Sequence, residues 1–371
     1  MKQNAPFRAD VVGSYLRPES LKQARKAFSE GLLDRESLTA IEDSAIADLV
    51  KKQKAAGLSS LTDGEFRRSW WHLDFMWGME GIGKCSAKTG YKFQGEVTRA
   101  DSAQVTGRIQ AVNHPFVQHF AYLHQFEDDQ SRARQTIPAP AQLYAELVRG
   151  KNEQEITRYY PDKDLLFDDI AKAYQTVIQG LYAQGCRNVQ LDDCTWGMFC
   201  DVSFQQKMGW KDADISAMAN LYVELNNKAL ENKPSDLVVT THVCRGNYHS
   251  TWASSGGYEP IAKYLFPQEK VSAFYLEFDT ERAGGFEPLR FVPDDKTVVL
   301  GLITSKTPSL ENPSLIEKRI EDASHFVSID RLCLSPQCGF ASTEEGNILS
   351  EEEQWNKVAL VRDIAKVVWN D

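Results

Sequence analysis

Eight short apolar or β-branched segments constrain the fold of this chain more than any other feature. Each segment ends in polar residues, and amphipathic helical stretches alternate with them. The segments are residues 10–14, 60–65, 136–140, 189–193, 238–242, 274–277, 299–303 and 332–335. Strands that alternate with helices form parallel sheets, and eight such units are typical of a closed (β/α)8 TIM barrel. The sequence therefore predicts an α/β fold in which one catalytic barrel domain spans residues 1–371.

The stretches between the segments have helical periodicity. From Asp162 to Gly185, apolar residues recur every three or four positions, which places them on one face of a helix. The same reasoning predicts helices over residues 18–30, 35–56, 214–231, 313–326 and 350–369. Residues 81–113 break this rhythm, and the alternation from Tyr91 to Val97 predicts an inserted hairpin near the barrel mouth.

Composition and charge exclude several classes of protein. The chain is 42% hydrophobic and 25% charged, as in ordinary globular proteins, and no apolar run approaches the roughly 20 residues of a membrane helix. A formal net charge of −10 argues against nucleic acid as the main partner. The first residues lack the apolar core of a secretion signal. We therefore expect a cytoplasmic protein with neither a nucleic-acid nor a membrane partner.

Two residues near the end of the fifth segment indicate a metal site. His242 and Cys244 are two positions apart on a predicted strand, so their side chains point to the same face. Cys338 and Glu277 lie near the ends of two other segments, and zinc accepts this mixture of nitrogen, sulfur and oxygen. These four residues are the predicted Zn²⁺ ligands.

Two other interpretations of the same residues stay open. His242 could be a hydrogen-bonded core residue beside buried free cysteines. A disulfide between Cys244 and Cys338 is the second alternative. The seven cysteines are scattered rather than arranged as a disulfide framework, which argues against it.

Candidate catalytic and substrate-binding residues end three further segments. Ser14 ends the first segment, Glu65 the second, and the pair Asp192 and Asp193 the fourth. Barrel enzymes carry their chemistry at the carboxyl ends of the strands, and paired carboxylates complement an ammonium group. The alternatives are a helix cap for the aspartate pair and an ion pair of Glu65 with Arg67 or Arg68.

Five motifs occur in the order found in one known family. They are Val12-Gly13-Ser14-Tyr15-Leu16-Arg17-Pro18, Asp63-Gly64-Glu65, Gln190-Leu191-Asp192-Asp193, Thr241-His242-Val243-Cys244 and Pro336-Gln337-Cys338-Gly339. On these residues, nearly the whole chain resembles the catalytic C-terminal barrel of cobalamin-independent methionine synthase. It resembles the short single-barrel proteins grouped with that enzyme still more closely.

The resemblance implies a zinc-dependent methyltransferase of methionine biosynthesis, similar to 5-methyltetrahydropteroyltriglutamate-homocysteine S-methyltransferase. Zinc would convert the thiol of homocysteine to a thiolate, which attacks the methyl group of the donor. The implied zinc ligands are His242, Cys244, Glu277 and Cys338, with Asp279 as the alternative to Glu277. A backbone amide near Ser14 would take the homocysteine carboxylate, while Glu65 and Asp192 would bind its ammonium.

Aromatic and cationic residues follow Glu65 directly. Trp70 and Trp71, with Arg67, are suited to a flat pterin-like ring or an anionic tail, and the alternative is a packed helix start. Arg245 and Asn247 are further pocket candidates. The other cysteines are interpreted as structural, and Cys194 is notable among them because it adjoins Asp193.

The residues expected to act on the methyl donor depart from the family pattern. The family carries a histidine acid after the seventh strand, where this chain reads Leu302-Ile303-Thr304-Ser305-Lys306. A methyl group leaving folate needs a protonated nitrogen, so the expected donor is either a folate or a methylated corrinoid, free or carried by a corrinoid protein. Lys306 either replaces the acid or is a surface lysine. The 371 residues also leave no room for the second, N-terminal barrel of the folate-dependent enzyme.

Two other functions remain open. One is a zinc-dependent thiol alkyltransferase of the same superfamily with a different thiol or alkyl donor, such as an epoxide. The other is a protein that binds zinc and homocysteine without turnover.

Overall fold

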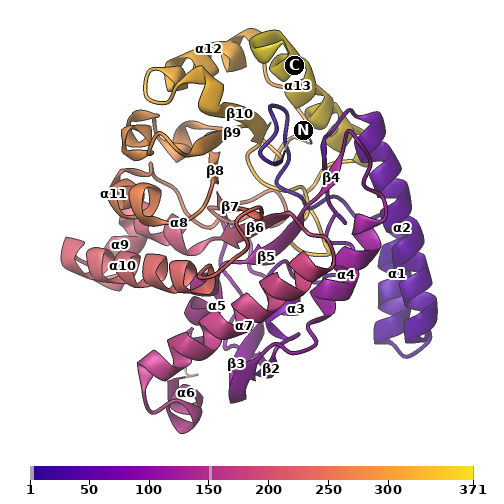
Figure 1. Cartoon of the computed structure of the whole chain (residues 1–371), viewed down its shortest axis with the longest axis vertical. Coiled ribbons are helices and arrows are strands. Elements are labelled where there is room, and N and C mark those ends of the chain that lie inside the picture. The colour runs from indigo at the N-terminus through magenta and orange to yellow at the C-terminus, as the bar shows by residue number, and fades with distance from the viewer. Residues whose placement is uncertain (1–3, 150–152, 371) are drawn as a thin grey trace.

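A six-stranded parallel sheet forms the centre of the molecule. The computed structural model describes residues 4–149 and 153–370. In these ranges the sheet has the order β10-β9-β8-β7-β6-β5 (Figure 1). Its strands are β5 (Gln135–Pro138), β6 (Asn188–Asp193), β7 (Val238–Val243), β8 (Ala273–Glu277), β9 (Thr297–Ile303) and β10 (Leu332–Pro336). Neighbours in the sheet are consecutive in the chain, as expected for repeated strand-helix units.

Two further segments close this sheet into a ring. Ala9 and Ser14, in the N-terminal segment, form parallel bridges to Leu334 of β10 and to Gly64. The chain before Gly64 includes β1 (Ser60–Leu61), which pairs in parallel with β4 (Arg132–Ala133), directly before β5. These pairings complete eight parallel segments around a ring, which is the predicted (β/α)8 arrangement.

The N-terminal segment is more irregular than predicted. Residues 10–14 form extended chain with isolated bridges rather than a regular strand. The Asp10 side chain accepts hydrogen bonds from the backbone amides of Phe7 (3.0 Å) and Val11 (2.7 Å), and Gly13 has a φ of 137°. Such local side-chain bonds compete with the regular ladder of a sheet.

Helices surround the sheet on its outer side (Figure 1). The longer ones are α1 (Glu19–Ser29), α2 (Arg35–Ala55), α4 (Pro115–His124), α7 (Lys163–Ala183), α10 (Asp212–Ala229), α11 (Glu259–Gln268), α12 (Pro313–Ser324) and α13 (Glu351–Trp369). The shorter ones are α3 (Leu73–Met76), α5 (Pro140–Leu147), α6 (Glu153–Tyr159), α8 (Thr195–Cys200) and α9 (Val202–Met208), with 3-10 turns at Glu281–Ala283, Glu287–Phe291 and Ile329–Arg331. The six helices predicted from periodicity are confirmed, each end within two residues.

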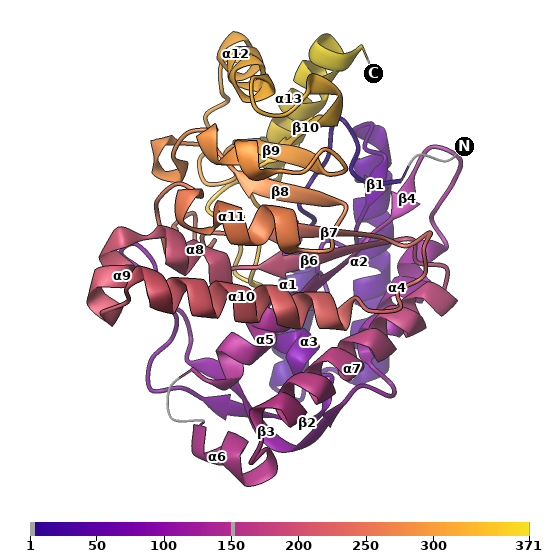
Figure 2. The same cartoon turned by 60° about the vertical axis from the view of Figure 1, so that its left-hand side comes forward.

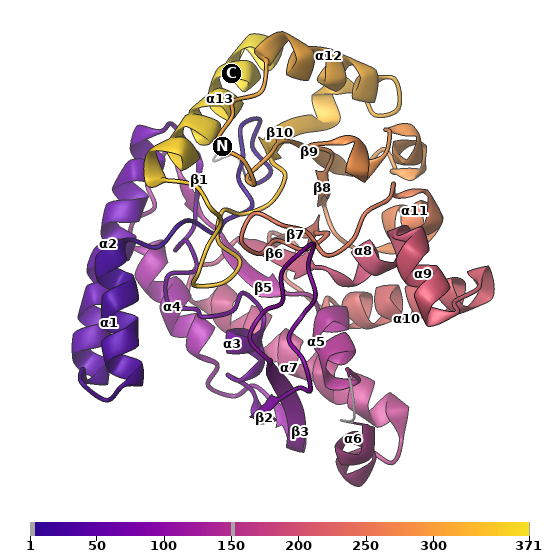
Figure 3. The ribbon, with the colours of Figure 1, turned by 180° about the vertical axis from the view of Figure 1, so that it is seen from behind.

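An antiparallel hairpin interrupts the barrel after α3. It consists of β2 (Glu80–Ser86) and β3 (Asp101–Gln110) and lies at the opposite end of the molecule from α12 and α13 (Figure 2). The predicted hairpin is therefore confirmed, but residues 91–97 form its loop and not its strands. This loop rises toward β6 and β7 (Figure 3), and the Gln94 amide donates to the Trp252 carbonyl at 2.8 Å.

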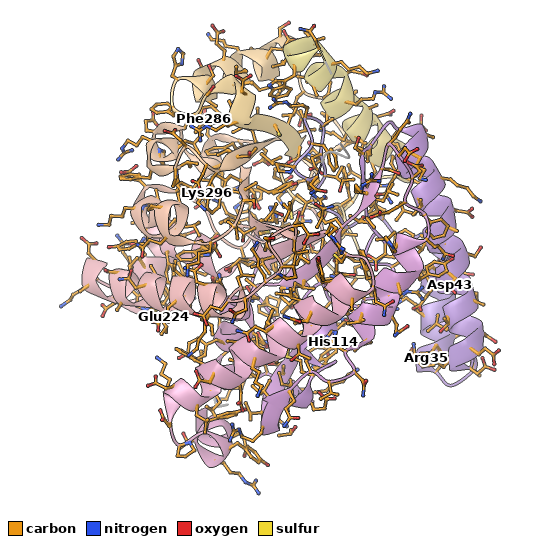
Figure 4. The ribbon with its side chains drawn as sticks, in the orientation of Figure 1. Arg35, Asp43, His114, Glu224, Phe286 and Lys296 are labelled. Atoms are coloured by element: carbon orange, nitrogen blue, oxygen red, sulfur yellow. The ribbon has the colours of Figure 1, made fainter. Side chains whose placement is uncertain are left out.

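Side chains fill the space that the ring encloses (Figure 4). Inside the barrel, Arg134 Nη1 lies 3.1 Å from Asp10 Oδ1 and donates to the Tyr275 hydroxyl at 2.8 Å. Tyr275 in turn donates to Asp10 Oδ2 at 2.7 Å. These three buried groups satisfy one another, as a charge inside a protein requires. Within the described ranges, no helix combines the length and apolar character needed to cross a bilayer.

Candidate metal centre and substrate cavity

The four predicted metal ligands lie together at the carboxyl ends of three strands. His242 is the next-to-last residue of β7 and Cys244 lies just beyond its end, Glu277 ends β8, and Cys338 follows β10. All four are buried, and one possible ligand atom from each lies within 4.8 Å of the others. The Cys244 and Cys338 Sγ atoms are 3.6 Å apart and both cysteines are free, so they form no disulfide. Two sulfurs bound to one tetrahedral zinc at about 2.3 Å would lie roughly 3.8 Å apart, which this spacing fits.

The imidazole of His242 is oriented for metal binding. Its Nδ1 lies 3.2 Å from the Tyr275 carbonyl oxygen, which can only accept, so Nδ1 carries the proton. The opposite nitrogen, Nε2, is buried and has no hydrogen-bond partner among the described residues. A carbonyl that holds one nitrogen while the other faces the metal is the usual support of a histidine ligand. A bound metal would satisfy the otherwise unpaired Nε2.

Glu277, and not Asp279, supplies the oxygen of this group. Glu277 Oε1 accepts from the Arg245 backbone amide at 2.8 Å, and Oε2 lies 3.3 Å from Arg282 Nη2. Burial raises the pKa of Glu277 to about 7, with a further contribution from Cys244. Asp279 pairs with Arg282 at 3.1 Å and lies outside the four-residue group.

A glycine in β9 allows the neighbouring ligands to approach. Gly301 pairs with Glu277 on one side and with Ser335, near Cys338, on the other. A Cβ at Gly301 would lie 2.7 Å from Gln337 Cα and 2.8 Å from the Leu276 carbonyl oxygen. Both neighbours are backbone atoms, so a side chain has no room there.

A cavity of about 410 Å³ opens beside this group. His242, Cys244 and Cys338 line it, whereas Glu277 lies behind them. The predicted substrate residues that also line it are Ser14, Glu65, Trp70, Trp71 and Asp192. The cavity therefore brings a candidate metal centre and two carboxylates together.

Glu65 is held in an unusual conformation. Its φ of 62° is in the left-handed region, which is strained for a residue with a side chain. Oε1 accepts from Thr136 Oγ1 at 2.9 Å and lies 3.1 Å from Arg68 Nη1, while Oε2 is buried without a partner among the described residues. Burial raises the pKa of Glu65 against the opposing effect of Arg68. The ion pair considered for Glu65 is thus present, and Arg68 forms it.

Asp192 and Ser14 are held by hydrogen bonds to residues next to them in the fold. Asp192 Oδ1 accepts from Gln190 Nε2 at 2.8 Å, and burial raises the pKa of Asp192 to about 7. The Ser14 hydroxyl accepts from the Ala341 amide at 3.3 Å. A Cβ at Gly339 would lie 1.9 Å from Ser14 Oγ, so the chain beside Cys338 passes directly over Ser14.

Comparison with known proteins identifies the family. Residues 156–366 match the model of the cobalamin-independent synthase catalytic domain. The chain belongs to this family. The uncharacterized proteins YxjG and YxjH of Bacillus subtilis are 43% and 42% identical to it, over 99% of this chain and 96% of each relative. A methionine synthase of Pyrococcus abyssi is 23% identical over 96% of this chain and 92% of its own.

Two solved structures share the fold along almost the whole chain. One, from Listeria monocytogenes, is provisionally named a vitamin-B12 independent methionine synthase. It has 39% identity and a TM-score of 0.79, and covers 100% of both chains. The other is a B12-independent methionine synthase from a Shewanella species in complex with selenomethionine. At 18% identity and a TM-score of 0.75, covering 99% of this chain and 98% of its own, it supports the barrel fold alone.

Two residues predicted to bind substrate, Arg67 and Asp193, lie outside the cavity lining. Arg67 forms ion pairs with Glu42, at 3.2 Å, and with Asp43. Asp193 accepts at 2.9 Å from the amide of Thr195, the first residue of α8, although Cys194 and not Asp193 is the N-cap residue of that helix. Successive side chains of a strand alternate in direction, so Asp193 points away from the cavity that Asp192 lines.

Cys194, interpreted from the sequence as structural, lines the cavity. Thiol hydrogen bonds from Cys194 and Cys338 hold the pKa of Cys244 well below its usual range. The cobalamin-independent synthase domain of this chain thus places a third thiol beside two of its candidate ligands. Its position next to Asp193 was the only sequence signal for this.

Lys306 is not a surface lysine. Its Nζ is buried and donates to Asn247 Oδ1 at 2.8 Å, to the Thr251 carbonyl at 3.1 Å and to the Gly246 carbonyl at 3.3 Å. These bonds fix the loop that follows Cys244. Lys306 itself lies outside the cavity lining, so its ammonium group is committed to the loop and not presented to a ligand.

The hairpin loop contributes Tyr91 to a hydrogen-bonded set of three residues that the sequence did not predict. The Tyr91 hydroxyl lies 2.8 Å from His72 Nε2 and also donates to Glu146, and all three residues line the cavity. Burial lowers the pKa of His72 to about 3, so its imidazole is neutral at physiological pH. No local pattern predicts this contact, because it depends on where the loop folds.

Proposed function

We propose that this protein is a zinc-dependent methyltransferase that transfers a methyl group to the thiol of homocysteine to give methionine. The observation that carries the proposal is one cavity that joins a buried His-Cys-Glu-Cys group to the carboxylates of Glu65 and Asp192. Membership of the cobalamin-independent synthase family supports the reaction class.

The donor set fits zinc. His242, Cys244, Glu277 and Cys338 would hold the metal, with one imidazole, two thiolates and one carboxylate. Bound zinc supplies the positive charge that keeps a thiol deprotonated at neutral pH. The buried, unpaired Nε2 of His242 and the sulfur spacing support this assignment.

The carboxylates account for the choice of an amino-acid thiol. Glu65 and Asp192 would bind the homocysteine ammonium, because each is buried and Glu65 Oε2 has no partner among the described residues. A backbone amide near Ser14 would receive the homocysteine carboxylate. Held at both ends, the substrate would present its sulfur to the metal side of the cavity. The new S–CH₃ bond then forms as the donor–CH₃ bond breaks and its electron pair stays on the donor.

The experiment is methionine formation by the zinc-loaded protein. Homocysteine is supplied with methyl-folate in one reaction and with methylcobalamin in another, and methionine is measured by mass spectrometry. We expect methionine with at least one donor and none with the Cys338→Ser variant. Binding of zinc and homocysteine without methionine from either donor would overturn the proposal in favour of a binding protein or an alkyltransferase with a different donor.

A further inference from the structure

One side of the cavity is lined almost wholly by apolar and aromatic side chains. It is formed by residues of α8 and α9, the segment after α9 and α10, which together are called the aromatic wall: Met198, Phe199, Phe204, Met208, Trp210 and Tyr222. The rings form one continuous cluster. The Phe199 centroid lies 5.4 Å from that of Trp210 and 5.6 Å from that of Tyr222, and Phe204 lies 5.4 Å from Trp210.

The aromatic wall begins close to the metal group. Cys194, which contacts Cys244, immediately precedes α8, and α8 and α9 lie beside the β7–β8 side of the barrel (Figure 3). Met198 is four residues further along, a rise of about 6 Å in a helix. A molecule that contacts the wall can therefore reach toward the metal group.

The wall is not ordinary core. Phe199 is buried, but Phe204 and Trp210 are only half-buried and Met208 is 51% exposed. All of α9 is described, and none of its side chains is buried. Large apolar side chains gathered in this way along a cavity are typical of a binding surface.

The charges around the cavity argue against a polyanionic ligand on this wall. Among the described lining residues, the cations are Lys92, Arg149 and Arg245, and none belongs to α8, α9 or α10. Arg149 is paired with Glu146 at 2.9 Å, and the Arg245 guanidinium donates to the Gly256 carbonyl at 2.8 Å. No lining cation therefore lies on the wall itself, and Lys207 and Lys211, which flank Met208 and Trp210 in the sequence, are exposed outside the cavity lining.

We propose that the aromatic wall binds a neutral aromatic group of the methyl donor. This inference rests on the proposed function, in which homocysteine occupies the metal side of the cavity. Homocysteine has no aromatic part, so the wall is left for the second substrate. Stacking on Phe204 and Trp210 would hold the donor by its ring system and place its methyl group toward the substrate sulfur.

Binding of the neutral fluorescent probe N-phenylnaphthylamine tests the wall without zinc, homocysteine or turnover. We expect the wild-type protein to bind the probe with a rise in fluorescence, and Phe204→Ala and Trp210→Ala to weaken binding about tenfold or more. Met208→Gln, at an exposed position, should weaken it less. Phe326→Ala is the matched control, because Phe326 is an aromatic residue that is 38% exposed outside the cavity lining. Equal probe binding by wild type and both aromatic variants would overturn the proposal.

A second experiment tests whether the aromatic wall binds the methyl donor. In the methionine assay, with whichever donor is active, the probe should inhibit competitively against that donor and not against homocysteine. Phe204→Ala should raise KM for the donor and leave zinc content and homocysteine affinity unchanged. Competition against homocysteine alone would overturn the assignment. A failure of the methionine assay would contradict the proposed function. Equal probe binding by wild type and the aromatic variants would contradict only the proposed role of the aromatic wall.

Discussion

The two ends of the cavity are built in opposite ways. The end beside the candidate metal ligands is formed by His242, Cys244 and Cys338, with Glu277 behind them, all buried at or just beyond strand ends; the Tyr275 carbonyl, for example, holds His242. The aromatic wall is formed mostly by two short helices, α8 and α9, with Trp210 and Tyr222 beside them, and several of its side chains are partly exposed. Reaction chemistry needs atoms fixed within fractions of an ångström, and the sheet provides this. Recognition of a second substrate tolerates a more adaptable surface.

The largest expected effect is loss of the metal from one end alone. Cys338→Ser removes one of two thiolate ligands, so we expect most of about one zinc per chain to be lost. The measurement is metal analysis of the purified protein, with circular dichroism to show that the fold survives. Cys85→Ser is the matched control, because Cys85 is a half-buried cysteine on the hairpin. Equal zinc in wild type and Cys338→Ser would remove the metal assignment.

The next largest effect concerns the thiol substrate. Asp192→Asn should weaken homocysteine binding by about 2 to 5 kcal/mol, because the ammonium loses a buried charged partner. This corresponds to roughly 30-fold or more in Kd, measured by calorimetry. Mercaptobutyrate, which is homocysteine without its amino group, should lose much less affinity. The same loss for both thiols would show that Asp192 does not bind the ammonium.

A smaller effect is expected on the free energy of unfolding, at Glu269, which lies at neither end of the cavity. Glu269 is buried behind the sheet near Asp193, accepts from Asn226 Nδ2 at 2.8 Å, and lies near Lys296, labelled in Figure 4. Burial raises the pKa of Glu269 from 4.5 to about 8. The folded state therefore keeps a proton that the unfolded chain releases, so this group makes stability fall as pH rises between these values.

The Glu269→Gln variant tests this sign. Relative to the variant, wild type should lose on the order of 1 to 4 kcal/mol of unfolding free energy between about pH 5 and pH 9. Urea denaturation of both proteins at each pH provides the measurement. Parallel pH profiles would contradict the raised pKa, and zinc content should be the same in both proteins.

The smallest effect is expected where the sequence predicted a role in substrate binding. Arg67→Met should leave homocysteine affinity within about twofold of wild type, because Arg67 pairs with Glu42 and Asp43 outside the cavity lining. The same calorimetric titration used for Asp192→Asn measures it. A large loss of homocysteine affinity in Arg67→Met would show that Arg67 contributes to substrate binding after all.

The grouping of the four candidate metal ligands was predictable because strand geometry is local. Alternation puts His242 and Cys244 on one face, and the barrel brings strand ends together. The same alternation, applied to the fourth strand, would have separated Asp192 from Asp193. The choice between Arg67 and Arg68 was not predictable, because the left-handed turn at Glu65 decides which arginine meets its carboxylate.

The aromatic wall could not be predicted for a different reason. Phe204 and Trp210 acquire their role only from the way α8 and α9 fold over the barrel mouth. Short helices also contain too few residues to show a clear helical periodicity in the sequence. The irregular N-terminal strand has a similar cause. Its backbone follows the hydrogen bonds of Asp10, whose own position depends on Arg134, more than a hundred residues away.

Gly301 shows that a site can depend on an atom that is absent. Among the described strands, β9 lies between β8, which carries Glu277, and β10, which precedes Cys338, yet the residue of β9 between these ligands has no side chain. A comparison of sequences that asks only for histidine, cysteine and glutamate overlooks this position. When related chains are screened for the same centre, the residue at the place of Gly301 is therefore a discriminating criterion, because a bulkier residue there would leave all four ligands in the sequence and still separate them in space.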